Sequence, residues 1–193
     1  MRKCFCFQSV FALLLGLMAV PATAQIVSVG EVVRDFTVVD RPNGRPLRMS
    51  DFAGRIVVLD FFAHWCGPCR SASADLERNV RQYYVERGGS SAHLPVIVIG
   101  INIDPSHPER TDDFVRRAGL ELAADDVNHE AFDQFDEKNA VPLVVVINGA
   151  AGVPGRKQWE LLYRKVGYEG AAALRALIDS IKTSAPAAGE PSR

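Results

Sequence analysis

The sequence predicts a single α/β domain in which helices cover a mixed sheet. Three observations predict it: buried apolar strands alternate with amphipathic helices, the first two such strands flank a helix, and two late strands precede a closing helix. Two strands that flank a helix predict a parallel crossover, and the two late strands predict a hairpin. A net charge of −1 gives no electrostatic basis for binding nucleic acid or an anionic membrane surface.

The N-terminal half supplies a hairpin, a strand and a helix. Residues 35–40 and 46–50 are extended and flank a turn-like segment, RPNGR. Residues 55–62, RIVVLDFF, are β-branched and almost continuously apolar, as in a strand buried on both faces. Apolar residues then recur at three- and four-residue spacing, which predicts a helix over 68–87 with Pro68 in its first turn.

The C-terminal half repeats the alternation of strands and helices. Its expected elements are a buried strand at 95–103, a helix opened by the capping-box pattern at 106–109 and closed by Gly119, a short helix at 130–136, strands at 140–147 and within 157–168, and a helix whose apolar residues are Leu174, Leu177, Ile178 and Ile181. Residues 183–193 are small and polar, so we expect a disordered tail and a folded domain at 25–182.

Residues 1–24 have the pattern of a secretory signal peptide. Two basic residues precede an apolar run at 10–20, and the small residues Ala22 and Ala24 follow. We expect cleavage after Ala24, which leaves a mature chain in the periplasm or another exported compartment. An uncleaved membrane anchor is the alternative, although the run is shorter than the ~18 apolar residues that predict a spanning helix.

Two cysteines, Cys66 and Cys69, follow the buried strand in the segment WCGPC. A disulfide across so short a loop stabilises a fold by less than the ~3 kcal/mol expected of a fifteen-residue loop. A lone C-x-x-C offers two ligands where a closed zinc site needs four, and the four histidines show no ligand spacing in the sequence. We therefore expect no metal and no cofactor, and we interpret the pair as a redox-active disulfide.

A helix that begins at this motif suits thiol chemistry. Its free N–H groups and dipole favour a thiolate at the first cysteine, so Cys66 is expected to be the exposed nucleophile and Cys69 the buried partner. Gly67 permits close approach of a substrate, Pro68 stiffens the turn, and Trp65 shields one side. His64 is interpreted as an ordinary loop histidine.

The segment WCGPC after a buried strand resembles the thioredoxin active site. The leader, the N-terminal hairpin, the additional segment after the second buried strand and the later AVPLVVVINGAAG extend this resemblance to the exported TlpA/ResA-like thiol–disulfide oxidoreductases, over residues 29–181. The resemblance implies a thioredoxin-like fold with an N-terminal β-hairpin and an extra βα segment before the cis-proline strand. It also implies that Cys66 is the nucleophile, that Cys69 resolves the mixed disulfide, and that Pro142 is the cis-proline.

The residues around the motif add expectations for Val141 and Asp60, and they differ from the family pattern at Ala72 and Ala74. The backbone of Val141, before Pro142, is expected to pair with an extended substrate segment. Ala72 and Ala74 stand where relatives often carry glutamate and proline, and the glutamate is commonly assigned a proton-handling role. Asp60 is then the only acid that the sequence offers near the site. We expect burial to raise its pKa toward neutrality and Asp60 to exchange a proton with Cys69, with structural burial beside a water or lysine as the alternative.

The expected function is that of an exported thiol–disulfide oxidoreductase that reduces disulfides in partner proteins. Electrons would come from a membrane relay protein, in a role such as cytochrome c maturation. A peroxiredoxin is disfavoured because Ala63 stands where a threonine is expected, three residues before Cys66. A non-catalytic exported protein that handles copper or acts as an adaptor remains the alternative, since paired thiolates bind Cu(I).

Overall fold

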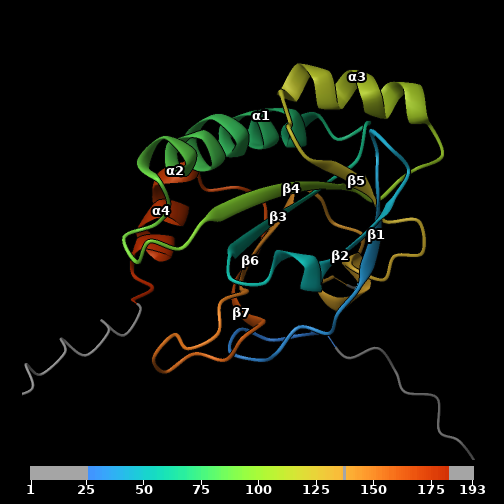
Figure 1. Ribbon diagram of the computed structural model, residues 1–193. Coiled ribbons are helices and arrows are strands. Elements are labelled where there is room, and N and C mark those ends of the chain that lie inside the picture. The colour runs from blue at the N-terminus through green and yellow to red at the C-terminus, as the bar shows by residue number, and fades with distance from the viewer. Residues whose placement is uncertain (1–25, 137, 183–193) are drawn as a thin grey trace, which may run out of the picture.

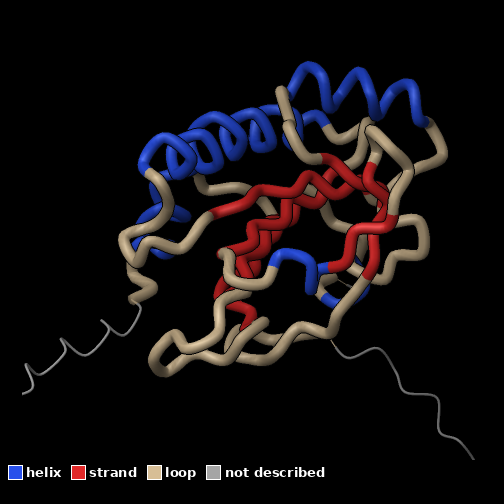
Figure 2. Tube along the Cα trace, in the orientation of Figure 1, coloured by secondary structure: helices blue, strands red, loops and turns tan. Residues whose placement is uncertain are grey.

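The computed structural model describes residues 26–136 and 138–182. In this part of the chain seven strands form one mixed sheet, in the order β2-β1-β5-β4-β3-β6-β7, which carries helices on its faces (Figures 1 and 2). The strands are β1 (Thr37–Asp40), β2 (Pro46–Arg48), β3 (Ile56–Phe62), β4 (Val96–Asn102), β5 (Ala123–Asp125), β6 (Leu143–Asn148) and β7 (Glu160–Val166). The helices are α1 (Gly67–Leu76), α2 (Gln82–Arg87), α3 (Pro108–Ala118) and α4 (Ala171–Asp179), with short helical turns at Met49–Phe52, Glu77–Arg81 and Phe132–Gln134. The predicted α/β class is confirmed.

Strand β3 lies at the centre of the sheet, and its pairing positions everything that follows it. It runs parallel to β4 and antiparallel to β6. In this register Phe62 lies opposite Asn102 at the end of β4, and Phe61 lies opposite Leu143 at the start of β6. The carboxyl end of β3 therefore meets the carboxyl end of β4 and the amino end of β6.

The continuous apolar run of β3 is explained by burial on both faces, since all seven of its residues are buried. Alternate side chains enter two separate apolar clusters. Val57, Leu59 and Phe61 pack with residues of the N-terminal segment and the turn at Phe132–Gln134. Ile56 and Val58 pack instead with side chains of α1, α2 and α4, among them Leu76, Tyr84 and Ile178.

A single long helix carries the C-x-x-C motif at its first turn. α1, a π-helical turn at Glu77–Arg81 and α2 follow one another without a break, so the helix predicted over 68–87 is confirmed with a start at Gly67. Gly88 ends it in the left-handed conformation at φ 73°. Figure 1 shows α3 beside α1 and α4 beside α2.

The N-terminal hairpin is confirmed and is joined to the sheet by a strand that periodicity did not find. β1 pairs antiparallel with β2 and also with β5, and β5 runs parallel to β4. β5 is the three-residue segment Ala-Ala-Asp, which has no β-branched residue to mark it as a strand. The extra segment before the cis-proline strand therefore consists of α3 followed by β5.

Several predicted boundaries are wrong by a few residues. The predicted capping box does not form, because His107 is the N-cap of α3 and the Ser106 hydroxyl bonds to Asp104 instead. Gly119 closes α3 as predicted. The strand expected from residue 140 begins at Leu143, since Pro142 has no N–H for the ladder, and the short helix expected at 130–136 is only the turn Phe132–Gln134.

The predicted signal peptide at 1–24, its cleavage after Ala24 and the predicted tail at 183–193 lie outside the described residues. Within the described ranges, no helix has both the length and the apolar character needed to cross a membrane.

Arg41 connects the hairpin to the rest of the sheet. Its Nη1 donates to both carboxylate oxygens of Asp125 at 2.6 and 2.5 Å, and its Nη2 donates to Asp112 Oδ1 at 2.6 Å. Only 9% of the Arg41 side chain is exposed, so these bonds form where little water competes.

We expect Arg41→Ala to lower the free energy of unfolding by about 2 kcal/mol, because a hydrogen bond to a charged group contributes about 1.5–3 kcal/mol. Urea denaturation measures the change. Arg45→Ala is the matched control, since Arg45 is an exposed arginine of the same hairpin. An equal loss in the two variants would show that Arg41 does not connect these elements.

Candidate active site

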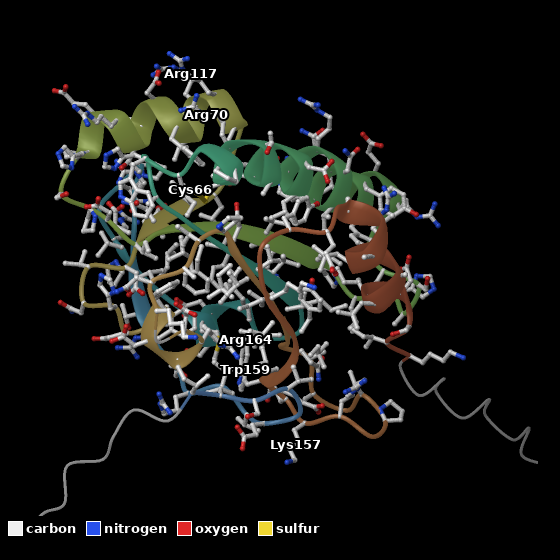
Figure 3. The ribbon with its side chains drawn as sticks, turned by 180° about the vertical axis from the view of Figure 1, so that it is seen from behind. Cys66, Arg70, Arg117, Lys157, Trp159 and Arg164 are labelled. Carbon is white, nitrogen blue, oxygen red and sulfur yellow. A yellow bond between two sulfur atoms is a disulfide. The ribbon has the colours of Figure 1, made fainter. Side chains whose placement is uncertain are left out.

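The C-x-x-C motif lies where β3 passes into α1. Cys66 is the N-cap of α1, and its Sγ accepts a hydrogen bond from the Cys69 N–H at 3.2 Å. Pro68 lies in the first turn, where backbone N–H groups have no acceptor within the helix, so the N–H that proline lacks is not needed there. Figure 3 shows Cys66 beside Arg70, on the opposite side of the domain from Trp159. The first sulfur therefore lies at the positive end of a helix, as thiolate chemistry requires.

Cys66 and Cys69 form a disulfide, with their Cα atoms 5.3 Å apart. Cys69 is fully buried, as predicted. The prediction that Cys66 is exposed is wrong, because only 5% of its surface reaches solvent. One neighbour that covers Cys66 is the backbone of Val141, whose carbonyl oxygen lies 3.6 Å from Cys66 Sγ.

The Val141–Pro142 peptide bond is cis, as predicted. Pro142 is buried just before β6, and its carbonyl accepts a hydrogen bond from the Gly167 N–H at 2.7 Å. The Val141 side chain is half-buried. The turn before β6 is thus held against the disulfide by the register of β6 beside β3.

Three of the predicted substrate-contacting residues are exposed around the disulfide. Trp65 is 59% exposed, and Gly67 and Pro68 are exposed at the first turn of α1. A Cβ atom at Gly67 would meet nothing within 4 Å. No packing reason for glycine is therefore found in the described chain, and its role in substrate approach stays a prediction.

Asp60 is fully buried in β3, between Gly100 of β4 and Val144 of β6. Neither of its carboxylate oxygens has a hydrogen bond of good geometry among the described residues, although the Ser73 hydroxyl lies close enough to lower its pKa. Burial raises the pKa of Asp60 to about 7, and the Ser73 hydroxyl opposes this rise only in part. The predicted buried carboxyl with a raised pKa is confirmed.

Ser73 is a member of this site that sequence reasoning missed. It lies on α1 one turn after Cys69, it is fully buried, and its hydroxyl has no partner in the described part of the chain. The signal in the sequence was its spacing of four residues from Cys69, which places both side chains on one face of the helix. Asp60 and Ser73 thus form a polar pair beneath the resolving cysteine.

A second acid near the motif was also missed. The Trp65 indole N–H donates to Asp104 Oδ2 at 3.0 Å, so Asp60 is not the only acid close to the site. Hydrogen bonds from the Ser106 hydroxyl and the Trp65 indole hold the pKa of Asp104 below its usual value, and the carboxylate is ionised. Adjacent parallel strands end at one edge of a sheet. The position of Asp104 just after β4 was therefore the sequence signal that it would lie near Trp65, which follows β3.

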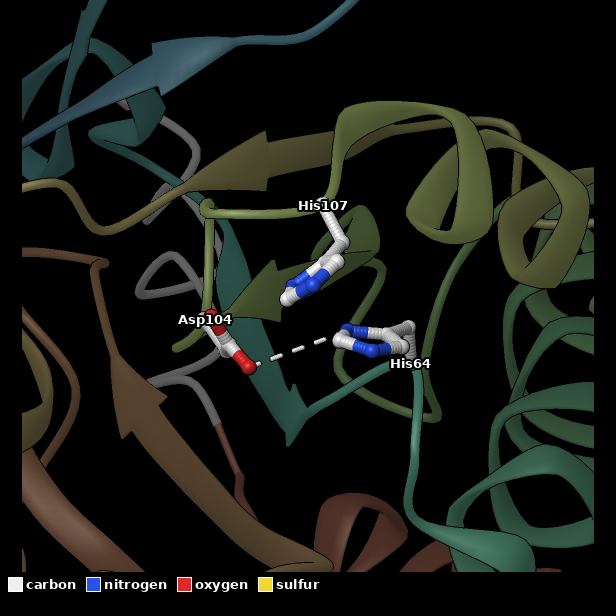
Figure 4. A group of neighbouring side chains, drawn as sticks. All are labelled: His64, Asp104 and His107. Atoms are coloured by element: carbon white, nitrogen blue, oxygen red, sulfur yellow. Dashed lines mark ion pairs between the residues drawn. The ribbon is translucent and has the colours of Figure 1, made fainter.

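The structure also brings together two histidines that show no ligand spacing in the sequence. His64, Asp104 and His107 each offer one ligand atom, and these atoms lie within 4.8 Å of one another (Figure 4). His64 Nδ1 is 3.8 Å from Asp104 Oδ2. His64 therefore belongs to a cluster beside Trp65, and its interpretation as an ordinary loop histidine stays untested.

Comparison with known proteins identifies the family. The model of the AhpC/TSA family matches residues 29–158, which is more than half of the chain. The chain belongs to the AhpC/TSA family. The predicted TlpA/ResA grouping is narrower than this match and stays a prediction.

Individual relatives of this AhpC/TSA protein agree with its fold. Thioredoxin H-type from Brassica oleracea is 31% identical over 83 residues, which are 43% of this chain and 58% of that protein. The solved DsbF homologue from Corynebacterium diphtheriae has a TM-score of 0.62 at 24% identity, over 81% of this chain and 91% of that one. A secreted thiol-disulfide isomerase from Corynebacterium glutamicum has a TM-score of 0.63 at 20% identity, over 77% and 83%. The predicted thioredoxin-like fold is confirmed.

Replacing the buried carboxyl should stabilise this AhpC/TSA protein at neutral and alkaline pH. The folded protein binds the Asp60 proton more tightly than the unfolded chain does, so its stability falls as pH rises from about 4 to about 7. The pKa difference corresponds to at most about 4 kcal/mol. We expect Asp60→Asn to raise the free energy of unfolding by about 1–3 kcal/mol at pH 8, less than this limit because the amide is also buried without partners.

Urea denaturation of the oxidised protein from pH 4 to 8 measures this difference. The gain should shrink toward pH 4, where the wild-type carboxyl is protonated. Asp133→Asn replaces a carboxylate whose side chain is 60% exposed and should change stability by less than about 0.5 kcal/mol. A gain at Asp60→Asn that is independent of pH would contradict the assignment.

Proposed function

We propose that this protein is an exported thiol–disulfide oxidoreductase that reduces disulfides in partner proteins. The observation that carries the proposal is the Cys66–Cys69 disulfide, which lies at the first turn of α1 with the Val141 carbonyl 3.6 Å from Cys66 Sγ. This arrangement places an attacking sulfur, a resolving sulfur and the backbone of Val141 within reach of one another. Structural staples and metal clips need no such backbone segment.

The reaction begins from the reduced pair. The Cys66 thiolate attacks one sulfur of the substrate disulfide, a mixed disulfide forms, and the other substrate sulfur leaves as a thiolate. Cys69 then attacks Cys66 Sγ, which releases the second substrate thiol and closes the Cys66–Cys69 ring. Two electrons have passed from the pair to the substrate. The Cys69 N–H bond to Cys66 Sγ and the helix dipole stabilise the Cys66 thiolate at the start of this sequence.

The low exposure of Cys66 favours a substrate that approaches as an extended chain. A folded surface could not reach a sulfur that is 5% exposed, whereas a strand-like segment can lie along Val141 and present its own disulfide at Cys66. Trp65, Gly67 and Pro68 are exposed around this path. Backbone pairing would give affinity for many partner proteins with little demand on their side chains.

Asp60 is proposed to exchange a proton with Cys69. The resolving thiol must lose its proton as it attacks, and it lies in an interior that water does not reach. A carboxyl with a pKa of about 7, beneath the same helix face, can take that proton and return it when the ring reopens. It would serve in place of the glutamate that relatives carry at the position of Ala72.

The proposals of export and of reduction are supported by the leader-like segment, by a secreted structural neighbour and by the residues between the cysteines. The leader-like residues 1–24 support export, and the C. glutamicum structure is described as that of a secreted protein. An exported reductant needs electrons from outside its compartment, so a membrane relay protein is the proposed donor and cytochrome c maturation is one such role. The Gly-Pro pair between the cysteines is shared with thioredoxin, a strong reductant at about −270 mV.

We expect Cys66→Ser to abolish reduction of insulin, because the attacking thiolate is lost, and Cys69→Ser to accumulate a mixed disulfide with substrate. Insulin precipitation measures the first outcome and intact mass under non-reducing conditions the second. The control is Cys4→Ser with Cys6→Ser, which should leave activity unchanged. Normal activity in Cys66→Ser would refute the mechanism, and a midpoint potential near the −120 mV or so of DsbA would refute the reductant assignment.

We expect Asp60→Asn to slow the release of substrate from the mixed disulfide by about 100-fold at pH 7, the lower end of what general acid–base catalysis contributes. Single-turnover kinetics followed by Trp65 fluorescence measure this step. Wild-type release should accelerate as pH rises through about 7, and the variant should lack this inflection.

Ser73→Ala is the matched variant for the proton step. It removes the hydroxyl that lowers the pKa of Asp60, so the inflection should move to higher pH while the rate at high pH is retained. Release at the wild-type rate in Asp60→Asn between pH 6 and 9 would rule out a proton-transfer role for Asp60.

A further inference from the structure

A cluster of two imidazoles and a carboxylate lies beside the disulfide and is not used in the mechanism above. His64 follows β3, whereas Asp104 and His107 follow β4, and the two strands are parallel neighbours that end at Phe62 and Asn102. Figure 4 shows the three side chains turned toward one another from these two loops. The carboxyl ends of adjacent parallel strands are a recurrent place for ligand sites in α/β proteins.

His64 is a buried polar side chain with an unsatisfied ring nitrogen among the described residues. Only 6% of its side chain is exposed, and its Nδ1 has no hydrogen-bond partner among the described residues. His64 Nδ1 lies 3.8 Å from Asp104 Oδ2, which is too far for a hydrogen bond. A cation between the two groups would give His64 Nδ1 the partner that it lacks.

We propose that His64, Asp104 and His107 bind a divalent transition-metal ion of the Zn²⁺ type beside the redox disulfide. Two imidazole nitrogens and one carboxylate oxygen form a three-ligand set, which leaves a fourth position for water or another ligand. Tetrahedral Zn²⁺ with bonds of about 2.0–2.1 Å requires ligand atoms about 3.3 Å apart. The present separations of up to 4.8 Å require a closure of the cluster. His107 is exposed, and its Nδ1 lies 2.8 Å from the Ser106 hydroxyl, a contact that the closure would keep or exchange for the ion.

Two members of the cluster can be reached from solvent, since His107 is exposed and His64 lines a groove. His64 lines a groove of about 490 Å³ together with Trp65, Arg70, Glu109, Arg110 and Asp113. Two arginines and two carboxylates balance the charge of this groove, so neither a cation nor an anion is excluded from it. The three ligands come from the loops after β3 and β4, which the strand pairing holds at a set distance.

Metal binding would be sensed by Trp65. Its indole N–H donates to the same Asp104 oxygen that faces His64. An ion that takes this oxygen weakens or breaks the indole hydrogen bond, which changes the environment of a tryptophan next to Cys66. The cluster is therefore placed to report on the disulfide region and to alter it, without using either cysteine as a ligand.

Isothermal titration of Zn²⁺ into the purified, untagged chain tests the proposal. The protein is kept oxidised, so that the Cys66–Cys69 disulfide offers no thiolate, and it carries Cys4→Ser and Cys6→Ser. We expect one Zn²⁺ per chain and no binding of Mg²⁺, which prefers octahedral oxygen ligands. His107→Ala and Asp104→Asn should each weaken Zn²⁺ binding by at least about tenfold, since loss of even an outer partner of a metal ligand costs that much.

His129→Ala is the matched control. His129 Nδ1 lies 3.7 Å from Asp133 Oδ1, a histidine–aspartate pair of nearly the same spacing that belongs to no group of three ligands among the described residues. Its loss should leave the affinity unchanged. Absence of saturable Zn²⁺ binding, or binding that survives both His107→Ala and Asp104→Asn, would overturn the proposal. Because the disulfide stays closed throughout, this result is independent of the redox function.

Tryptophan emission gives a second readout that does not depend on activity. In a Trp159→Phe background Trp65 is the remaining tryptophan of the two in the chain. Zn²⁺ should change its emission with the same midpoint as the calorimetric titration, and Asp104→Asn should abolish the change. Calorimetric binding without any change at Trp65 would overturn the assignment of Asp104 as a ligand.

Discussion

The pairing of β3 with β4 on one side and β6 on the other determines what meets at Cys66. Because β4 is parallel to β3, the loops after both strands lie at one edge of the sheet, which brings Asp104 to Trp65. Because β6 is antiparallel to β3, the turn that precedes it arrives at the same edge and brings Val141 to Cys66. A shift of either register by one residue would separate these groups and reverse the faces of the strand.

Reactivity at this edge is set by opposing effects on charge. The helix terminus and the Cys69 N–H favour a thiolate at Cys66, whereas the nearly complete burial of both cysteines disfavours charge on either. A redox pair needs this balance, since a thiolate that is too stable leaves easily and attacks poorly. The buried Asp60 carboxyl has no hydrogen bond of good geometry in the described part of the chain, so its charged form reduces stability. Proton exchange with Cys69 is the role that we propose for it.

Two polar groups thus flank the disulfide and differ in their access to water. Asp60 and Ser73 are fully buried beneath α1, where they can exchange protons only with protein groups. Asp104 and the histidines lie at the rim, where His107 is exposed and His64 lines a groove. The proposed proton exchange and the proposed metal site therefore use different side chains, and Trp65 joins the rim to the motif through its hydrogen bond to Asp104.

The sequence alone determined the α/β class, the long strands and helices, the redox interpretation of the C-x-x-C motif and the burial of Asp60. These follow from residues that are consecutive or one helical turn apart, where periodicity and chemistry act directly. It did not predict the short strand β5, the burial of Cys66 or the N-cap at His107, because pairing with neighbouring strands and loops overrides weak local preference. The cluster of His64, Asp104 and His107 was decided only by tertiary structure. Trp65 and Asp104 are 39 residues apart, and the distance between such residues depends on which strands pair and in which direction.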